Sequence, residues 1–117
     1  MKTVKAGTAT TKGSDGADCT LKYESKLPDY YIEYREAEKS GFKNFSGNLG
    51  IVAPDRVITR GVYNNCNGHL PNKEGRIWYD ADINYIGGFR NGQRIIYSND
   101  ELIFVTYDHY KTFFEMV

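Results

Sequence analysis

The chain has 117 residues, and its 15 lysine and arginine residues balance its 15 aspartate and glutamate residues, so its formal net charge is zero. This length fits one domain with one modest core, and the sequence contains no apolar run long enough to span a membrane. The charge balance excludes strong long-range attraction to a polyanion, so a nucleic-acid site would have to be a local cationic cleft.

The first segment, residues 1–16, is rich in Lys, Thr, Gly and Ser and has none of the apolar character of a signal peptide. We expect it to be flexible or linker-like, either a mature terminus or the remnant of a linker. Ser14 or Asp15 could then cap a short helix that runs to about Ser25, although Gly16 weakens it.

Two further helices are predicted before the middle of the chain. Residues 33–40 (EYREAEKS) have strong helix composition, and Gly41 is suited to end the helix. Asn48 could cap a third, short helix over residues 49–53, which Pro54 would terminate.

The second half of the chain changes from a period of about 3.6 to a period of two, which indicates strands. We expect strands over residues 56–63, 76–84, 94–97, 102–106 and 111–116, with an Asn-Gly turn signal at Asn91-Gly92. Helices followed by an antiparallel meander predict an α+β fold. We expect one domain, 1–117, in which two or three N-terminal helices pack on one face of a five-stranded antiparallel sheet and leave the other face for substrate.

Cys19 and Cys66 are the two cysteines of the chain. They could form a disulfide or remain unrelated thiols, because sequence does not fix the distance between them. Their spacing from the two histidines does not suggest a zinc site.

Candidate catalytic residues gather in the last third of the chain. Asp80 and Asp82 are two residues apart on a predicted strand and therefore point to the same face. Arg90, Arg94 and His109 follow among aromatic and β-branched residues. A carboxylate base, a cationic clamp and a titratable acid are what RNA cleavage by internal transesterification requires. No metal is needed, since the attacking hydroxyl belongs to the substrate. Taken singly, these residues could equally be solvated strand carboxylates, surface charges beside a turn and a loop histidine.

Several short motifs occur together in a fixed order: LPDYYI (27–32), GNL (47–49), VAP (52–54), HLP (69–71), ADINY (81–85), GFRN (88–91), RIIYS (94–98) and DHY (108–110). With these motifs the chain resembles the barnase and binase family of extracellular, guanyl-preferring bacterial ribonucleases. The resemblance covers roughly residues 26–117, and the segment before it matches poorly. No single motif would be specific, but their combination is.

The resemblance assigns roles to the candidate residues. Asp80 falls where the family has its catalytic glutamate, the general base, and the shorter side chain reaches roughly 1.5 Å less far. His109 matches the general acid, and Arg90 and Arg94 match the arginines that contact phosphate. Asp82 matches an aspartate that braces those arginines.

The resemblance also implies a base-recognition loop made of Tyr63, Asn64, Asn65, Cys66 and Asn67. Its backbone would read guanine, and Asn65 suits the positive φ that such a loop needs. Asn67 stands in place of a glutamate and Cys66 in place of an arginine, so guanine preference could be relaxed. Tyr110 matches a tyrosine that stacks on guanine.

A fourth departure lies on the second predicted helix, where Tyr34 replaces the family's active-site lysine. Arg35 is adjacent, but one residue along a helix turns the side chain by about 100°. His69 is expected to be a surface loop residue without a role.

We therefore predict a metal-independent endoribonuclease that needs no cofactor and cuts single-stranded RNA through a 2′,3′-cyclic phosphate. The resemblance implies a secreted monomer, or a toxin domain, with a barstar-like or other dedicated protein inhibitor as partner and no membrane association. Two alternatives stay open. The changes at Tyr34, Cys66 and Asn67 would fit a non-catalytic RNA-binding domain, and the zero net charge would fit a small interaction module.

Overall fold

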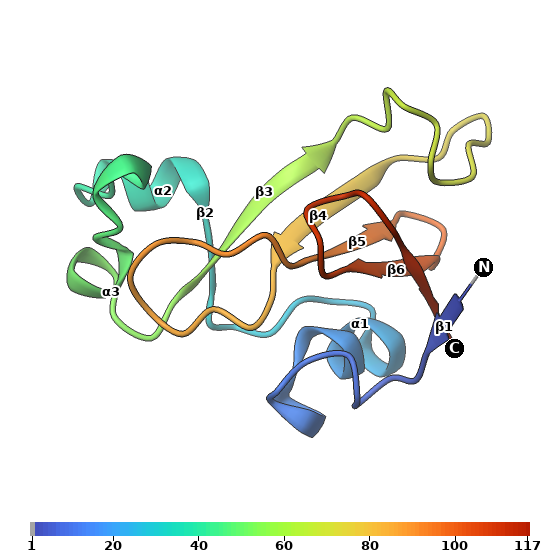
Figure 1. Ribbon diagram of the computed structural model, residues 1–117, viewed down its shortest axis with the longest axis horizontal. Coiled ribbons are helices and arrows are strands. Elements are labelled where there is room, and N and C mark those ends of the chain that lie inside the picture. Colours follow the sequence, from blue (N-terminus) through green and yellow to red (C-terminus); the bar gives the residue numbers. More distant parts are fainter. Residues whose placement is uncertain (1) are drawn as a thin grey trace.

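The computed structural model describes residues 2–117, which form one seven-stranded sheet and three α-helices (Figure 1). The strands are β1 (Lys2–Val4), β2 (Tyr31–Glu33), β3 (Val57–Tyr63), β4 (Trp78–Asp82), β5 (Arg94–Ser98), β6 (Ile103–Thr106) and β7 (Phe114–Met116). The helices are α1 (Ala17–Glu24), α2 (Tyr34–Lys39) and α3 (Leu49–Val52), with short 3₁₀ turns at Gly13–Asp15 and Asn44–Ser46. The predicted α+β class is confirmed.

The centre of the sheet is the predicted antiparallel meander, because β3, β4, β5, β6 and β7 pair in that order. The prediction of five strands was nevertheless too low. At one edge β1 pairs parallel with β7, and at the other β2 pairs parallel with β3. Each added strand has only three residues, which is too short for alternation to be visible in the sequence.

Helix α1 covers one face of the sheet. Ala17 and Leu21 of this helix pack in one buried cluster with side chains from the central strands, namely Ala81, Ile83, Ile95 and Val105. Because residues two apart on a strand share a face, this cluster takes the odd-numbered positions of β4 and β5. The even-numbered positions, which include Asp80, Asp82 and Arg94, therefore point to the opposite face.

Helices α2 and α3 pack at the β2–β3 edge in a cluster separate from that of α1, which corrects the prediction that all helices share one face. They lie beyond the β2–β3 edge, at the left of Figure 1. There they form a separate buried cluster of Ala37, Phe42, Leu49, Ala53 and Ile58. Helix α2 begins directly after the edge strand β2, with Glu33 as its N-cap. The chain therefore enters the helix at the edge of the sheet.

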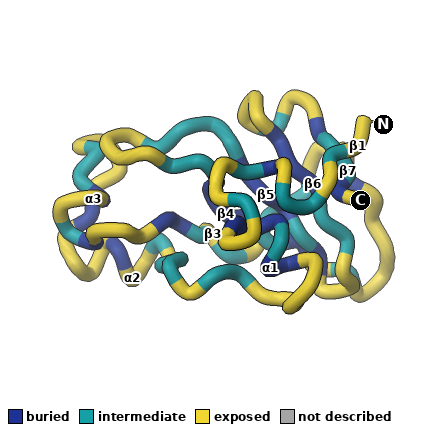
Figure 2. The backbone as a smooth tube through the Cα atoms, turned by 90° about the horizontal axis from the view of Figure 1, so that it is seen from below, coloured by how far each residue is buried: buried dark blue, intermediate teal, exposed yellow. Residues whose placement is uncertain are grey.

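Loops cover part of the second face. Leu70 and Phe113 come from the β3–β4 and β6–β7 connections and are buried against Trp78, Ile96 and Phe104. Figure 2 shows the buried backbone concentrated along the central strands, while the turns around α2 and α3 are exposed. The apolar cover lies over the Trp78 end of β4, so the Asp80–Asp82 end of that strand remains for polar side chains.

The described part of the segment predicted to be linker-like packs against the rest of the chain. Ala9 is buried, and the backbone N–H groups of Gly7 and Ala9 donate to the carboxylate of Asp18 at 2.6 and 3.1 Å. Cys19 and Cys66 are both free thiols in residues 2–117. No helix in this described range has the length and apolar character required to cross a membrane.

Candidate active site

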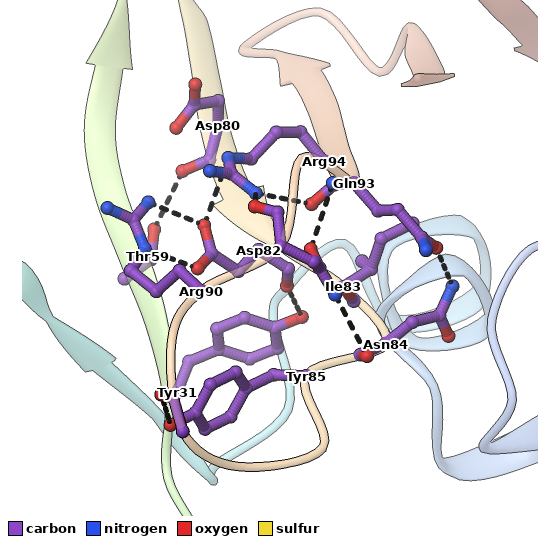
Figure 3. A network of polar contacts seen from close by, with 12 residues as sticks. Tyr31, Thr59, Asp80, Asp82, Ile83, Asn84, Tyr85, Arg90, Gln93 and Arg94 are labelled. Atoms are coloured by element: carbon purple, nitrogen blue, oxygen red, sulfur yellow. Dashed lines mark hydrogen bonds and ion pairs between the residues drawn. The ribbon is translucent and has the colours of Figure 1, made fainter. Parts of the chain in front are cut away.

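A buried ion pair organises the end of β4. Asp82 is 1% exposed, and its carboxylate accepts from Arg90 Nε at 2.6 Å and from Arg90 Nη2 at 2.8 Å. Arg94 Nε lies 3.1 Å from the same carboxylate (Figure 3). Arg94 also donates through Nη1 to the carbonyls of Asn91 and Gln93, at 2.6 and 2.8 Å. These contacts hold both guanidinium groups in place, as predicted for arginines braced by Asp82.

The electrostatics keep Arg90 charged. Burial alone would lower the pKa of its guanidinium, but the hydrogen bonds to Asp82 and the charge of that carboxylate outweigh burial and raise it. A bidentate, charge-assisted pair of this kind also fixes the plane of the guanidinium. The unengaged N–H groups of Arg90 and Arg94 can then address a phosphate without reorganisation.

Asp80 lies one pleat away from Asp82 on the same face of β4. It is 4% exposed, and its Oδ2 accepts from the hydroxyl of Tyr110 at 2.5 Å. Its Oδ1 is buried and has no hydrogen-bond partner within residues 2–117. Burial raises the pKa of this carboxyl, while the Tyr110 hydroxyl and the charges of Arg94 and Arg60 oppose the rise. A carboxylate with a raised pKa and an unused acceptor oxygen has the properties of a general base.

His109 and Tyr110 are presented by the β6–β7 loop, where both have left-handed backbone with φ of 57° and 70°. Asp108 organises this loop: it accepts from the hydroxyl and N–H of Thr112 and from the hydroxyl of Thr106, contacts that lower its pKa to about 2. Such backbone persists in non-glycine residues only where the surroundings impose it.

The same loop is anchored to the turn before β5. The N–H of His109 donates to the carbonyl of Gly92 at 3.0 Å, and a Cβ at Gly92 would lie 3.1 Å from the Cβ of His109. The ring of His109 is exposed and meets the ring of Tyr110 edge-on at 5.0 Å. Tyr110 therefore contacts both the predicted acid, His109, and the predicted base, Asp80.

The side chain of Asn65 ties the predicted base-recognition loop to the segment that follows it. Asn65 donates to the carbonyl of Leu70 at 2.7 Å and accepts from the N–H of Leu70 at 3.2 Å. The left-handed residue of this loop is Gly68, with φ of 68°, so the prediction of positive φ at Asn65 was wrong. Asn64 and Asn67 are exposed, and Asn67 accepts from the N–H of His69 at 3.1 Å.

The two tyrosines predicted to contact a base stack on one another. The rings of Tyr63 and Tyr110 are 5.2 Å apart with an interplanar angle of 13°. In this arrangement Tyr110 faces Tyr63 with its ring and Asp80 with its hydroxyl. A base that stacks on Tyr110 must therefore use the place occupied by Tyr63 or approach from another side.

Arg60 was not among the predicted site residues, and an irregularity of β3 brings it near the site. Thr59 pairs with Ala81 and Gly61 with Asp80, so Arg60 is the extra residue of a β-bulge opposite the Asp80–Ala81 step. Bulges re-aim side chains, often beside active sites. The guanidinium of Arg60 lies 4.2 Å from the ring centroid of Tyr34. An isolated arginine in a strand has no sequence signal that would reveal this position.

Comparison with known proteins identifies the family of this chain. A family model described as ribonuclease matches residues 9–117. Ribonucleases from Heyndrickxia coagulans, Bacillus intermedius and Bacillus pumilus are each 47% identical over 97 residues, or 83% of this chain. The match covers 88% of the first relative but only 59% of each of the other two, so the chain spans about three fifths of their length.

A carboxylate, a histidine and two braced guanidinium groups are the kinds of group that cleavage of a phosphodiester uses. The chain belongs to the ribonuclease family, because the family model matches most of its length and a named ribonuclease is 47% identical to it. The predicted resemblance to barnase and binase is thereby confirmed, and the chain is by family an endoribonuclease of the barnase type.

Proposed function

We propose that this protein cleaves single-stranded RNA without a metal ion, by transesterification through a 2′,3′-cyclic phosphate. The observation that carries the proposal is the buried, unpartnered Oδ1 of Asp80 on the same strand face as the braced Arg90 and Arg94. A base beside a phosphate clamp is the minimum needed to activate a ribose 2′-hydroxyl.

In the first half of the reaction Asp80 takes the proton from the 2′-hydroxyl as its oxygen attacks the adjacent phosphorus. Burial raises the pKa of Asp80, which strengthens the carboxylate as a base when it is ionised. The aspartate is shorter than the glutamate of the family. The 2′-hydroxyl must therefore come closer to β4, or the proton must pass through the hydroxyl of Tyr110, which already donates to Asp80.

Arg90 and Arg94 stabilise the charge that develops on the phosphate oxygens. Asp82 and the carbonyls of Asn91 and Gln93 hold their guanidinium groups before substrate arrives. Groups fixed in advance stabilise a transition state without the cost of reorganisation. Removal of one such donor typically lowers turnover by on the order of 10²–10³.

His109 completes the step by protonating the departing 5′-oxygen as the P–O5′ bond breaks. The histidine is exposed on a loop tied to Gly92, and its ring contacts Tyr110. Water then opens the cyclic phosphate with the roles of acid and base exchanged. The nucleophile comes from the substrate, so the reaction requires only groups of this chain and RNA.

Guanine is the preferred base in this proposal, but the preference is weaker than a glutamate would give. Asn67 is exposed and neutral, and it offers one amide oxygen where a carboxylate would accept two donors. Loss of one good bidentate contact reduces discrimination by about 1–3 kcal/mol. The backbone around Asn65 and the rings of Tyr63 and Tyr110 supply the remaining contacts to the base.

The wider setting is part of the same proposal. We infer a monomer, built as one domain over residues 1–117, that acts outside the producing cell or as a delivered toxin domain. It is restrained by a dedicated protein inhibitor. An inhibitor that places carboxylates against Arg90 and Arg94 would imitate RNA, so Arg90→Ala should weaken inhibitor binding as well as catalysis.

The test is cleavage of a labelled single-stranded RNA in the presence of a chelator. The wild-type protein should cut, and Asp80→Ala and His109→Ala should each lower turnover by on the order of 10²–10⁴ while the circular dichroism spectrum is unchanged. Full activity in the His109→Ala protein would refute the assigned acid. Asp80 is covered by Tyr110, which favours a non-catalytic RNA-binding domain as the second candidate. Retarded RNA without cleavage would support that candidate.

A further inference from the structure

Tyr34 occupies the place of a cation in this site and is flanked by two guanidinium groups. The guanidinium carbon of Arg60 lies 4.2 Å from the centroid of its ring, and that of Arg90 lies 5.6 Å from it. The ring also meets Phe42 edge-on at 5.4 Å and packs against the buried cluster that contains Phe42. The ring is therefore held by that core while it contacts two guanidinium groups.

Arg60 differs from the two predicted arginines in how its donors are used. Arg90 and Arg94 are largely buried and bonded to Asp82. Arg60 is exposed, and within residues 2–117 its side chain makes no hydrogen bond or ion pair; its one specific contact is the ring of Tyr34. A guanidinium has five N–H donors and no acceptor. All five of these donors are available to a ligand.

The position of Arg60 on β3 places its charge near Asp80. It is the bulged residue opposite the Asp80–Ala81 step of β4. Its charge is near enough to Asp80 to lower the pKa of that carboxyl. Arg60 and Arg90 both approach the ring of Tyr34, so the two guanidinium groups share one aromatic neighbour.

We propose that Arg60 is a third phosphate-binding cation of the substrate site, and that Tyr34 is the positioning residue that holds it there. The ligand is a phosphodiester of the RNA strand, next to the one held by Arg90 and Arg94 or shared with it. Stacking on an aromatic face restricts an exposed arginine while it leaves the edge of the guanidinium free for bidentate contact with phosphate. The charge missing at position 34 is then supplied from the neighbouring strand. This proposal rests on the proposed ribonuclease function.

The test measures binding separately from cleavage. A short, fluorescein-labelled, single-stranded deoxyoligonucleotide has no 2′-hydroxyl, so it binds without being cut, and its affinity is followed by fluorescence anisotropy over a salt series. Each phosphate contact of a single strand contributes about 0.7 to the slope of log K against log salt. Arg60→Gln should lower that slope by about this amount and weaken binding at low salt by roughly tenfold. Arg60→Lys should recover part of the loss.

Arg35→Gln is the matched control, because Arg35 is exposed and adjacent to Tyr34 in sequence but makes no contact with its ring. It should leave the slope unchanged. Tyr34→Phe should bind like the wild type, whereas Tyr34→Leu should weaken binding, and the effects of Tyr34→Leu and Arg60→Gln should not add. A wild-type slope in the Arg60→Gln protein, or an equal loss in Arg35→Gln, would overturn the proposal. If the wild type cleaves RNA but Arg60→Gln keeps the wild-type salt slope, the proposed role of Arg60 is refuted and the ribonuclease function stands. If Arg60→Gln lowers the salt slope but the wild type does not cleave RNA, the catalytic function is refuted and the phosphate contact of Arg60 stands.

Discussion

Replacement of Asp82 by asparagine should destabilise the protein strongly, because it removes the carboxylate that forms ion pairs with two buried guanidinium groups. Asp82 is 1% exposed, and the side chains of Arg90 and Arg94 are 11% and 6% exposed. Breaking a buried pair while its partner stays charged costs about 3–5 kcal/mol of unfolding free energy. For a domain of this size each kcal/mol changes Tm by about 4 °C, so we expect Asp82→Asn to melt about 12–20 °C lower.

The assay is thermal and urea unfolding followed by fluorescence of Trp78, which is the single tryptophan of the chain and is buried in the sheet. Glu36→Gln provides the control, since Glu36 pairs with Lys39 at 3.3 Å on the surface and its loss should cost less than about 0.5 kcal/mol. Equal unfolding midpoints for Asp82→Asn and the wild type would refute the buried ion pair as the organiser of this site.

Three further predictions concern the reaction. Asp80→Asn should lower turnover by on the order of 10²–10⁴ and raise stability at neutral pH. Burial raises the folded-state pKa of Asp80. The stability that its protonated form contributes is therefore present at low pH and is lost as pH rises through the folded-state pKa. An Asp80→Asn protein that unfolds more easily than the wild type at neutral pH would contradict this. For the same reason the acidic limb of the pH–rate profile should lie above the ordinary range of an aspartate. Tyr110→Phe should move that limb to higher pH, because the hydroxyl of Tyr110 stabilises the ionised carboxylate; carbon-13 titration of Asp80 in both proteins checks the shift independently of activity. Asn67→Glu should sharpen cleavage after guanosine relative to adenosine on dinucleotide substrates by about 1–3 kcal/mol of discrimination, and an unchanged ratio in a protein that is already strictly guanosine-specific would show that Asn67 does not contact the base.

The central strands and the shared face of Asp80 and Asp82 could be predicted from sequence because both depend on local signals. Alternation of apolar residues marks β3 to β6, and the two-residue spacing of Asp80 and Asp82 places them on one face. The edge strands β1 and β2 could not be predicted, since three residues carry no period. Each pairs with a strand that is distant in sequence, β1 with β7 and β2 with β3, so the pairing depends on the tertiary fold.

The missed features of the site depend on contacts between distant segments. The hydrogen bond from the hydroxyl of Tyr110 to Asp80 joins β4 to the β6–β7 loop. No local sequence pattern predicts this contact. Arg60 enters the site only because a bulge interrupts the pairing of β3 with β4. The replacement at Tyr34 was visible in the sequence as a lost cation. That the same ring supports another cation became apparent only from the distance between Tyr34 and Arg60.

The central claim is that Asp80 and His109 transfer protons during cleavage of RNA through a cyclic intermediate. Phosphorus-31 NMR of a guanosine-containing dinucleotide, incubated with the protein in a chelator, observes that intermediate directly. We predict that the resonance of a 2′,3′-cyclic phosphate appears as the dinucleotide signal falls, and that it decays later to a 3′-phosphate. Product with a 5′-phosphate and no cyclic resonance, or cyclic product formed at the same rate by Asp80→Ala, would contradict the account.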